Sequence, residues 1–153
     1  MGFEWQEEHD DERYFCTPLN AQMLGWLGVD GIHFCFIPSI SSEMVFVVSP
    51  MPCSDYYVQP IARRFNDFLS LLLFCRDATL LESVSYTDEI HFLEQVQIEK
   101  NIDYPKLERT LKQIQTAYGI EENTETYDYV RRLQAEFDYG EIPFSEKYYE
   151  IIV

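Results

Sequence analysis

Two short runs of β-forming residues, close together in the chain, place the strongest constraint on the fold. Residues 32–37 and 44–48 are rich in β-branched and aromatic side chains, and residues 38–43 between them have turn chemistry. This arrangement predicts an antiparallel hairpin. Alternate side chains of a strand point to opposite faces, and both faces of the first run are apolar. We therefore expect both faces of the hairpin to be covered.

The spacing of apolar residues changes downstream of the hairpin. A short edge strand is expected at residues 56–58, before Pro60. From residue 63 to residue 76, apolar side chains recur at every third or fourth position, which predicts an amphipathic helix of about 13 residues packed on the hairpin. The apolar side of that helix consists of Phe65, Phe68, Leu69, Leu72 and Leu73.

Residues 77–147 are expected to form a mostly helical extension. Asp77 is a candidate N-cap for a first short helix, and Thr87 is a candidate N-cap for a second. Asp103 followed by Pro105 marks the start of a third helix, because proline is tolerated in the first helical turn.

The pattern of apolar residues in this extension also predicts which side of each helix faces inward. In the second helix, Ile90, Leu93 and Ile98 alternate with glutamates and are expected to form the apolar stripe. A last helix is expected at residues 124–137. The tail, residues 148–153, has the composition of a strand and could return to the sheet.

The elements together predict a single α+β domain over residues 1–153. It has a small central antiparallel sheet packed by an amphipathic helix, with a helical C-terminal extension. Residues 1–13 carry many acids and are expected to form an N-terminal arm, with Trp5 as the exception. Residues 19–27 have helix-like spacing and are expected to form a short helix.

The charge of the chain limits its partners. There are 27 acidic residues against 11 Lys and Arg, a formal net charge of -16, which repels phosphate backbones and anionic lipid headgroups. We therefore expect neither nucleic-acid nor membrane binding. The charge fits two roles equally well, solubility or attraction of a basic partner. The basic pairs at residues 63–64 and 131–132 are expected to pair with local acids.

The N-terminal residues and the cysteines indicate a cytoplasmic protein with reduced thiols. No basic region or apolar run follows Met1, so a secretory signal is not expected. None of the four cysteines forms a Cys-x-x-Cys pair. A metal site joining His33 and Cys35 to Cys16 and Cys53 is the alternative to ordinary core packing. The His-x-Cys spacing on a strand lacks the geometry of structural zinc sites, so no cofactor is expected.

Catalytic motifs are missing from the sequence. It contains no Gly-x-Ser-x-Gly elbow, no phosphate-binding loop and no dinucleotide fingerprint. An acidic hydrolase that uses paired carboxylates is the enzymatic alternative. The acids are expected on the solvated side of each helix, which favours a protein that is not an enzyme.

Tyrosines next to acidic residues are the feature of the sequence that indicates a protein-binding surface. They cluster at residues 55–57, 127–129 and 148–149, and tyrosine gives a large rigid contact with a polar end. Asp55, Tyr56 and Tyr57 are the candidate partner-binding residues, because they lie in the loop that leaves the hairpin. The alternative is that these rings half-bury on the surface of the domain itself.

The order of hairpin, loop and helix over residues 32–75 resembles the second half of SUKH-superfamily domains. There a strand commonly leads into a helix with the pattern Ala-x-x-Phe-x-x-Phe-Leu, and Ala62, Phe65, Phe68 and Leu69 occupy the matching positions here. The superfamily includes fungal glucan-synthesis regulators and many bacterial immunity proteins. The resemblance implies an α+β fold, no catalysis, and a role in toxin neutralisation or as a regulatory scaffold. A housekeeping scaffold that binds a basic protein remains the other reading.

Overall fold

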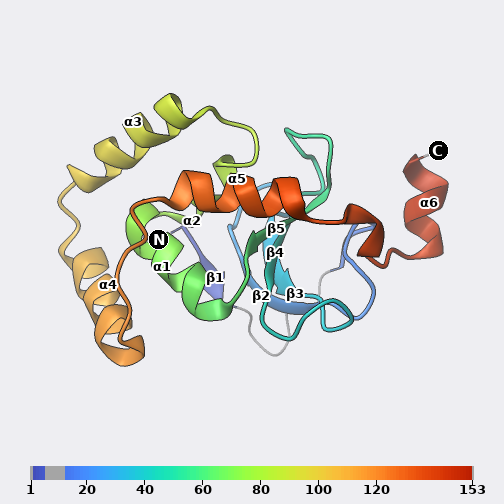
Figure 1. The fold of residues 1–153 in the computed structure, drawn as a ribbon, viewed down its shortest axis with the longest axis horizontal. Helices are drawn as coiled ribbons and strands as arrows, with labels where there is room; N and C mark the ends of the chain where they lie inside the picture. The colour runs from blue at the N-terminus through green and yellow to red at the C-terminus, as the bar shows by residue number, and fades with distance from the viewer. Residues whose placement is uncertain (1, 6–12, 153) are drawn as a thin grey trace.

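The computed structural model describes residues 2–5 and 13–152 and has an α+β fold. A five-stranded antiparallel sheet lies at its centre, with the strands side by side in chain order (Figure 1). The strands are β1 (Glu4–Trp5), β2 (Gln22–Trp26), β3 (His33–Phe36), β4 (Val45–Val48) and β5 (Val58–Ala62). Strands β1 and β5 therefore form the two edges.

The helices follow the sheet in the chain, as predicted. They are α1 (Phe65–Cys75), α2 (Ala78–Ser83), α3 (Glu89–Lys100), α4 (Pro105–Tyr118), α5 (Thr126–Glu136), the 3-10 turn η1 (Tyr139–Glu141) and α6 (Glu146–Ile152). None of the helices within residues 2–5 and 13–152 is long and apolar enough to cross a membrane.

The predicted hairpin is confirmed. Strands β3 and β4 pair with Phe34 opposite Val47 and Cys35 opposite Phe46. These side chains alternate between the two faces of the sheet, and each is buried. Both faces of the hairpin are therefore covered.

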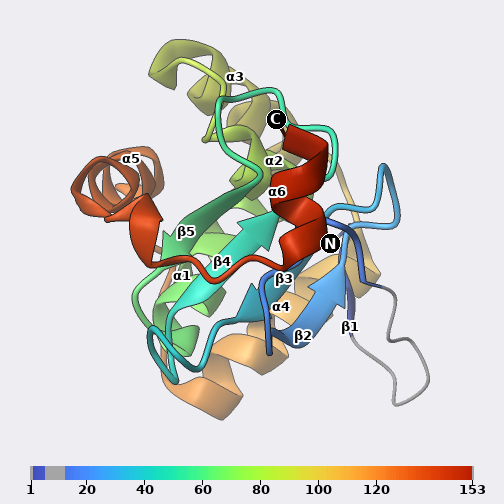
Figure 2. The same ribbon diagram turned by 90° about the vertical axis from the view of Figure 1, so that its right-hand side faces the viewer.

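Different parts of the chain cover the two faces of the sheet. Helices α1, α2 and α5 pack against the face that carries Phe34 and Val47 (Figure 1). Residues 14–21 and 137–148 pack against the face that carries Phe46, and α6 lies in front of this face in Figure 2. The sheet is thus the middle layer of the molecule.

Helices α1 and α2 follow the sequence prediction closely. The α1 helix buries Phe68, Leu69 and Leu72 against the sheet. It ends at Arg76, whose φ of 64° lies in the left-handed region and whose N–H donates to the carbonyl of Leu72. The next residue, Asp77, caps α2 as predicted, because its carboxylate accepts the N–H of Thr79.

The expected edge strand lies further along the chain than predicted, since only Val58 of residues 56–58 belongs to β5. Strand β5 does not stop before Pro60 but runs through it to Ala62, with Pro60 opposite Phe46. Proline is tolerated here because β5 pairs on one side only, and a proline on an edge strand removes no ladder hydrogen bond.

The predicted helix at residues 19–27 is wrong, since this segment contains strand β2. Gly25 explains the difference. A Cβ there would lie 2.2 Å from the ring of Phe3 and 2.5 Å from the carbonyl oxygen of Glu4. Glycine therefore lets β1 approach β2 closely, and Trp5 pairs with Gly25.

The predicted acidic arm is only partly described. Residues 6–12 lie outside the described residues. Glu4 and Trp5 form an edge strand and not a solvated arm, because Phe3 packs under them against Phe34 and Phe68, with ring centroids 5.5 and 6.0 Å away.

The C-terminal tail forms a helix, so the predicted strand at residues 148–153 is wrong for the part described. The ring of Phe144 stacks on that of Tyr148 at 3.7 Å, four residues later in the chain. Tyr148 also packs edge-on against Tyr57. These contacts hold Tyr148 of α6 against Phe144 and Tyr57, and they outweigh the strand propensity of the tail.

Two details of helix α3 also differ from the prediction. Asp88, not Thr87, is its N-cap, and the Thr87 hydroxyl instead donates to the carbonyl of Ser83. The inward side consists of Phe92 and Val96. The residues expected there are exposed by 74% (Ile90), 42% (Leu93) and 54% (Ile98).

Candidate functional site

The predicted binding loop lies above the sheet, between β4 and β5 (Figure 1). Asp55 is exposed. The ring of Tyr56 is 45% exposed and stacks on Tyr139 with centroids 3.8 Å apart. Tyr57 is half-buried and packs edge-on against Phe15 at 5.2 Å. Both tyrosines therefore already have aromatic partners within the chain.

The tyrosine cluster at residues 127–129 has a structural role. The hydroxyl of Tyr127 donates to the carbonyl of Thr87. The hydroxyl of Tyr129 donates to the Asp67 carboxylate at 2.9 Å and accepts the backbone N–H of Arg63. These bonds tie α5 to α1 and to the end of β5.

A buried carboxyl lies beneath the predicted binding loop. Glu82 of α2 is 5% exposed and accepts hydrogen bonds from the hydroxyls of Ser49 and Tyr86. Burial raises the pKa of the Glu82 carboxyl above its usual value, and the two hydroxyls partly offset this. The adjoining cavity of about 10 Å³ has room for about one water molecule and none for a substrate.

The side chain of His33 is buried on strand β3. Its Nδ1 donates to the carbonyl of Gly31 at 2.8 Å, and its Nε2 lies 3.5 Å from the Thr17 hydroxyl. Burial lowers the pKa of His33 to about 4, so the imidazole is neutral at pH 7. Cys35 lies on the same strand and is buried, but Cys53 is exposed. Among the described residues, no group of three His, Cys, Asp or Glu side chains could hold a metal ion.

A second aromatic cluster is open to solvent, and we call it the aromatic patch: Trp5, Phe36, Phe65 and Tyr118. Phe65 is its central ring, with centroids 6.4 Å from Trp5, 6.3 Å from Phe36 and 6.1 Å from Tyr118. Trp5 is 47% exposed and Tyr118 is 50% exposed, whereas Phe36 and Phe65 are half-buried.

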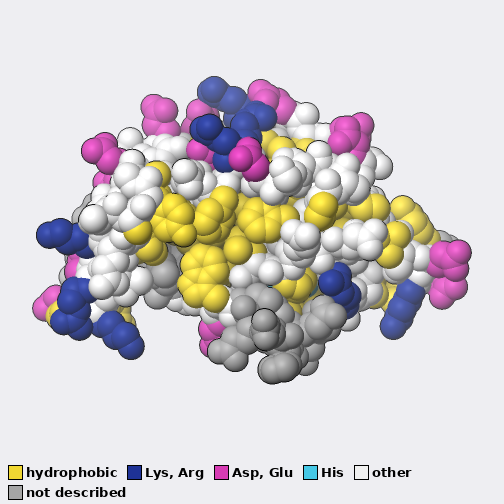
Figure 3. Space-filling view, turned by 90° about the horizontal axis from the view of Figure 1, so that it is seen from below, with side chains coloured by type: hydrophobic (Ala, Val, Ile, Leu, Met, Phe, Trp, Pro, Cys, Tyr) yellow, Lys and Arg dark blue, Asp and Glu magenta, His cyan; other side chains and the backbone are white. Residues whose placement is uncertain are grey.

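Four elements that are distant in the sequence bring the aromatic patch together. Its residues lie at the ends of β1, β3 and α4 and at the start of α1. The start of α1 and the end of α4 both lie low in Figure 1, and the view from below shows a broad hydrophobic area in the middle of that face (Figure 3). Trp5 was singled out in the sequence, but its neighbours could not be, because only the fold brings them together.

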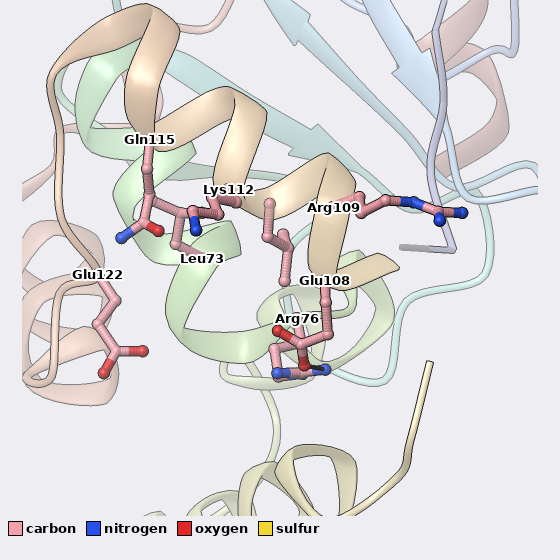
Figure 4. Close-up of a pocket in the computed structure, with 8 residues that line it drawn as sticks. Leu73, Arg76, Glu108, Arg109, Lys112, Gln115 and Glu122 are labelled. Carbon is pink, nitrogen blue, oxygen red and sulfur yellow. Dashed lines mark ion pairs between the residues drawn. The ribbon is translucent and has the colours of Figure 1, made fainter. Parts of the chain in front are cut away.

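A pocket of about 370 Å³ lies between α1 and α4. Leu73 and Leu111 contribute apolar surface to it. The guanidinium of Arg76 forms an ion pair with the carboxylate of Glu108 at one end, and Gln115 and Glu122 lie at the other (Figure 4).

The predicted pairing of the basic residues is confirmed for three of the four. Arg63 pairs with Glu136 at 2.9 Å, and Arg132 pairs with Asp128 at 2.9 Å. Arg64 pairs with Asp67 at 3.3 Å. Arg131 instead donates to the carbonyl of Ser85 and to the side chain of Gln134.

Comparison of the chain with protein-family models, with curated proteins and with solved structures gave no match.

Proposed function

We propose that this chain is a non-catalytic protein-binding domain whose aromatic patch is the centre of the contact with a basic protein. The observation that carries the proposal is the patch itself, in which Trp5 and Tyr118 are about half exposed around Phe65. Clusters of this composition dominate the binding energy of protein interfaces.

The aromatic patch is favoured over the loop at residues 55–57 as the binding site, because the rings of that loop already pack against other rings of the chain. Tyr56 stacks on Tyr139, and Tyr57 packs against Phe15 and Tyr148, so contact area on these rings is already used. The rings of the patch contact one another and still leave large areas of Trp5 and Tyr118 in solvent. Exposed apolar areas of this kind mark interaction sites in soluble proteins.

The charge of the chain supports a basic partner. The net charge is -16, and the strand that carries Trp5 also carries the exposed acid Glu4. A field of this sign raises the association rate of basic proteins and repels acidic ones. An exposed acid therefore lies next to Trp5 in the patch.

The biological role that we propose is toxin neutralisation or regulation, of the kind found in SUKH-superfamily proteins. The order of hairpin, edge strand and helix over residues 32–75 supports it, together with Ala62 and Phe65 at the positions the resemblance uses. For an immunity protein, the partner would be a basic toxin such as a nuclease, and the site of action would be the cytoplasm.

Affinity capture from a native lysate, at low and at high salt, tests the proposal. The wild-type chain is compared with a Trp5→Ala/Tyr118→Ala double variant and with Tyr104→Ala, an exposed tyrosine (53%) outside the patch. We expect the wild type and Tyr104→Ala to retain the same basic protein, the double variant to lose it, and high salt to weaken retention.

Co-expression separates the proposed roles. If the captured protein is a toxin, the wild-type chain restores growth of cells that express it, and the double variant does not. Retention of the captured protein by the double variant at the wild-type level would show that the contact lies elsewhere. Retention of acidic proteins only would contradict the charge argument.

A further inference from the structure

Arg76 is a charged residue in an unusual backbone and side-chain environment. Its side chain is only 11% exposed, and its φ of 64° is in the left-handed region at the end of α1. Glycine is the usual residue at such a position, and another residue there costs on the order of 1 kcal/mol. Strain of this kind is concentrated at functional sites.

The hydrogen-bonding capacity of Arg76 is poorly used. Its Nη2 forms an ion pair with Oε1 of Glu108. The Nε group of the same guanidinium is shielded from solvent and has no acceptor among the described residues. A buried N–H of a cation without an acceptor is unfavourable, and an oxyanion with two oxygens would pair with both Nη2 and Nε.

The pocket beside Arg76 has the size and the walls of a small-molecule site. Its volume of about 370 Å³ lies in the range of about 300–1,000 Å³ typical of such sites. Leu73 from α1 and Leu111 from α4 supply apolar surface. Lys112 and Gln115 extend from the same side of α4, and Arg109 points away (Figure 4).

The charge around the pocket is positive, in contrast to the net charge of the chain. Of the two carboxylates that line it, Glu108 pairs with Arg76, and Glu122 lies 3.5 Å from the ammonium of Lys100. Arg109 and Lys112 also line the pocket. Because both carboxylates are paired with cations and Arg109 points away, the ammonium of Lys112 is the remaining charge in the pocket, which favours an anion over a cation.

From these observations we infer that the pocket binds a small organic anion through a carboxylate or phosphate group. That group takes the place of the Glu108 carboxylate, pairs with the guanidinium of Arg76 and is contacted by Lys112. The Glu108 side chain is 54% exposed and can turn to solvent. The apolar part of the ligand lies on Leu73 and Leu111.

Titration of the full chain, labelled with ¹⁵N, tests the inference. Inorganic phosphate and hexanoate are the two probes, and sodium chloride at equal ionic strength is the reference. We expect saturable amide shifts at residues 73, 76, 108, 111 and 112 with at least one probe. Phosphate alone indicates a phosphate ligand, and hexanoate alone or more strongly indicates a carboxylate with an apolar tail.

Two variants and a control test which residues contribute to binding of the probe. Glu108→Gln removes the competing carboxylate and should tighten binding by roughly two- to fivefold, and Lys112→Gln should weaken it by a similar factor. Lys147→Gln, an exposed lysine on α6, is the matched control and should leave the dissociation constant unchanged.

The inference is overturned if neither probe gives saturable shifts, or if sodium chloride reproduces them. It is also overturned if Glu108→Gln binds no more tightly than the wild type, since the ligand would then not compete with the Glu108 carboxylate.

Discussion

At acid pH, the buried residue His33 should make the stability of the fold depend on pH. Folding lowers the pKa of His33 from 6.5 to about 4, because the ring is buried. Below pH 6.5 the unfolded chain gains a proton that the folded chain does not, so the stability present above this pH is lost as the pH falls toward 4.

The substitution His33→Phe should remove this loss. Between pH 6.5 and about 4, the free energy of unfolding of the wild type should fall by up to about 3 kcal/mol more than that of the variant. Urea unfolding at several pH values measures the difference. His91→Gln, at an exposed histidine, is the control and should follow the wild type.

Glu82 should make the stability depend on pH with the opposite sign to that of His33. Burial raises the pKa of its carboxyl from the usual 4.5, so the folded chain holds this proton more tightly than the unfolded chain does. Its contribution to stability is complete below pH 4.5 and decreases as the pH rises toward the folded pKa.

The substitution Glu82→Gln keeps a carbonyl acceptor for one of the two hydroxyls, places an NH2 donor beside the other and removes the buried charge. The stability of the variant relative to the wild type should therefore increase with pH above 4.5. Urea unfolding across this range tests it, with Glu89→Gln at an exposed position of α3 as the control. A constant difference across the range would show that the carboxyl titrates normally.

Substitutions in the predicted binding loop should affect stability differently. Asp55 is a surface residue, whereas Tyr56 and Tyr57 pack against other rings. Tyr57→Ala should cost about 2 kcal/mol, and Tyr56→Ala about 1 kcal/mol, because each ring loses aromatic contacts. Asp55→Ala should change stability by less than about 0.5 kcal/mol. Thermal unfolding measures all three.

The same variants test whether the loop takes part in binding the partner. If the loop contributes to the contact, Asp55→Ala and Tyr56→Ala weaken the binding of the captured partner. Unchanged affinity in both variants would show that the partner does not touch the loop.

At the scale of elements, the position of β1 depends on Gly25. A Cβ at this position would overlap the carbonyl oxygen of Glu4 at 2.5 Å, and backbone cannot move aside as a flexible side chain can. Gly25→Ala should therefore displace β1, destabilise the fold by about 2 kcal/mol and shift the emission of Trp5 to longer wavelength. Gln22→Ala, on the exposed end of β2, is the matched control.

Elements defined by local pattern could be predicted from the sequence, and those defined by distant contacts could not. The hairpin and α1 have regular periods of two and 3.6 residues, and the structure confirms both. Strand β2 was missed because the spacing of Leu19, Met23 and Trp26 imitates a helix. Its strand conformation comes from pairing with β1 and β3.

The inward side of α3 could also not be predicted from the sequence. Ile90, Leu93 and Ile98 are more numerous than the buried pair Phe92 and Val96, so the pattern favoured the wrong side. A helix that is apolar on both sides gives no clear periodicity.

At the scale of the whole molecule, the central claim is that a chain with a net charge of -16 binds a basic partner through the aromatic patch. The sequence indicated the charge and singled out Trp5. It could not place Phe65 and Tyr118 beside Trp5, since these residues are far apart in the chain and meet through the packing of β1, α1 and α4.

Fluorine NMR of the chain labelled with 5-fluorotryptophan tests this claim most directly. The two tryptophans give two resonances, one from Trp5 at 47% exposure and one from Trp26 at 8% exposure, and Trp5→Phe assigns them. On addition of the captured basic partner, the Trp5 resonance should shift and broaden while that of Trp26 stays in place. Formation of the complex with an unchanged Trp5 resonance would contradict the account.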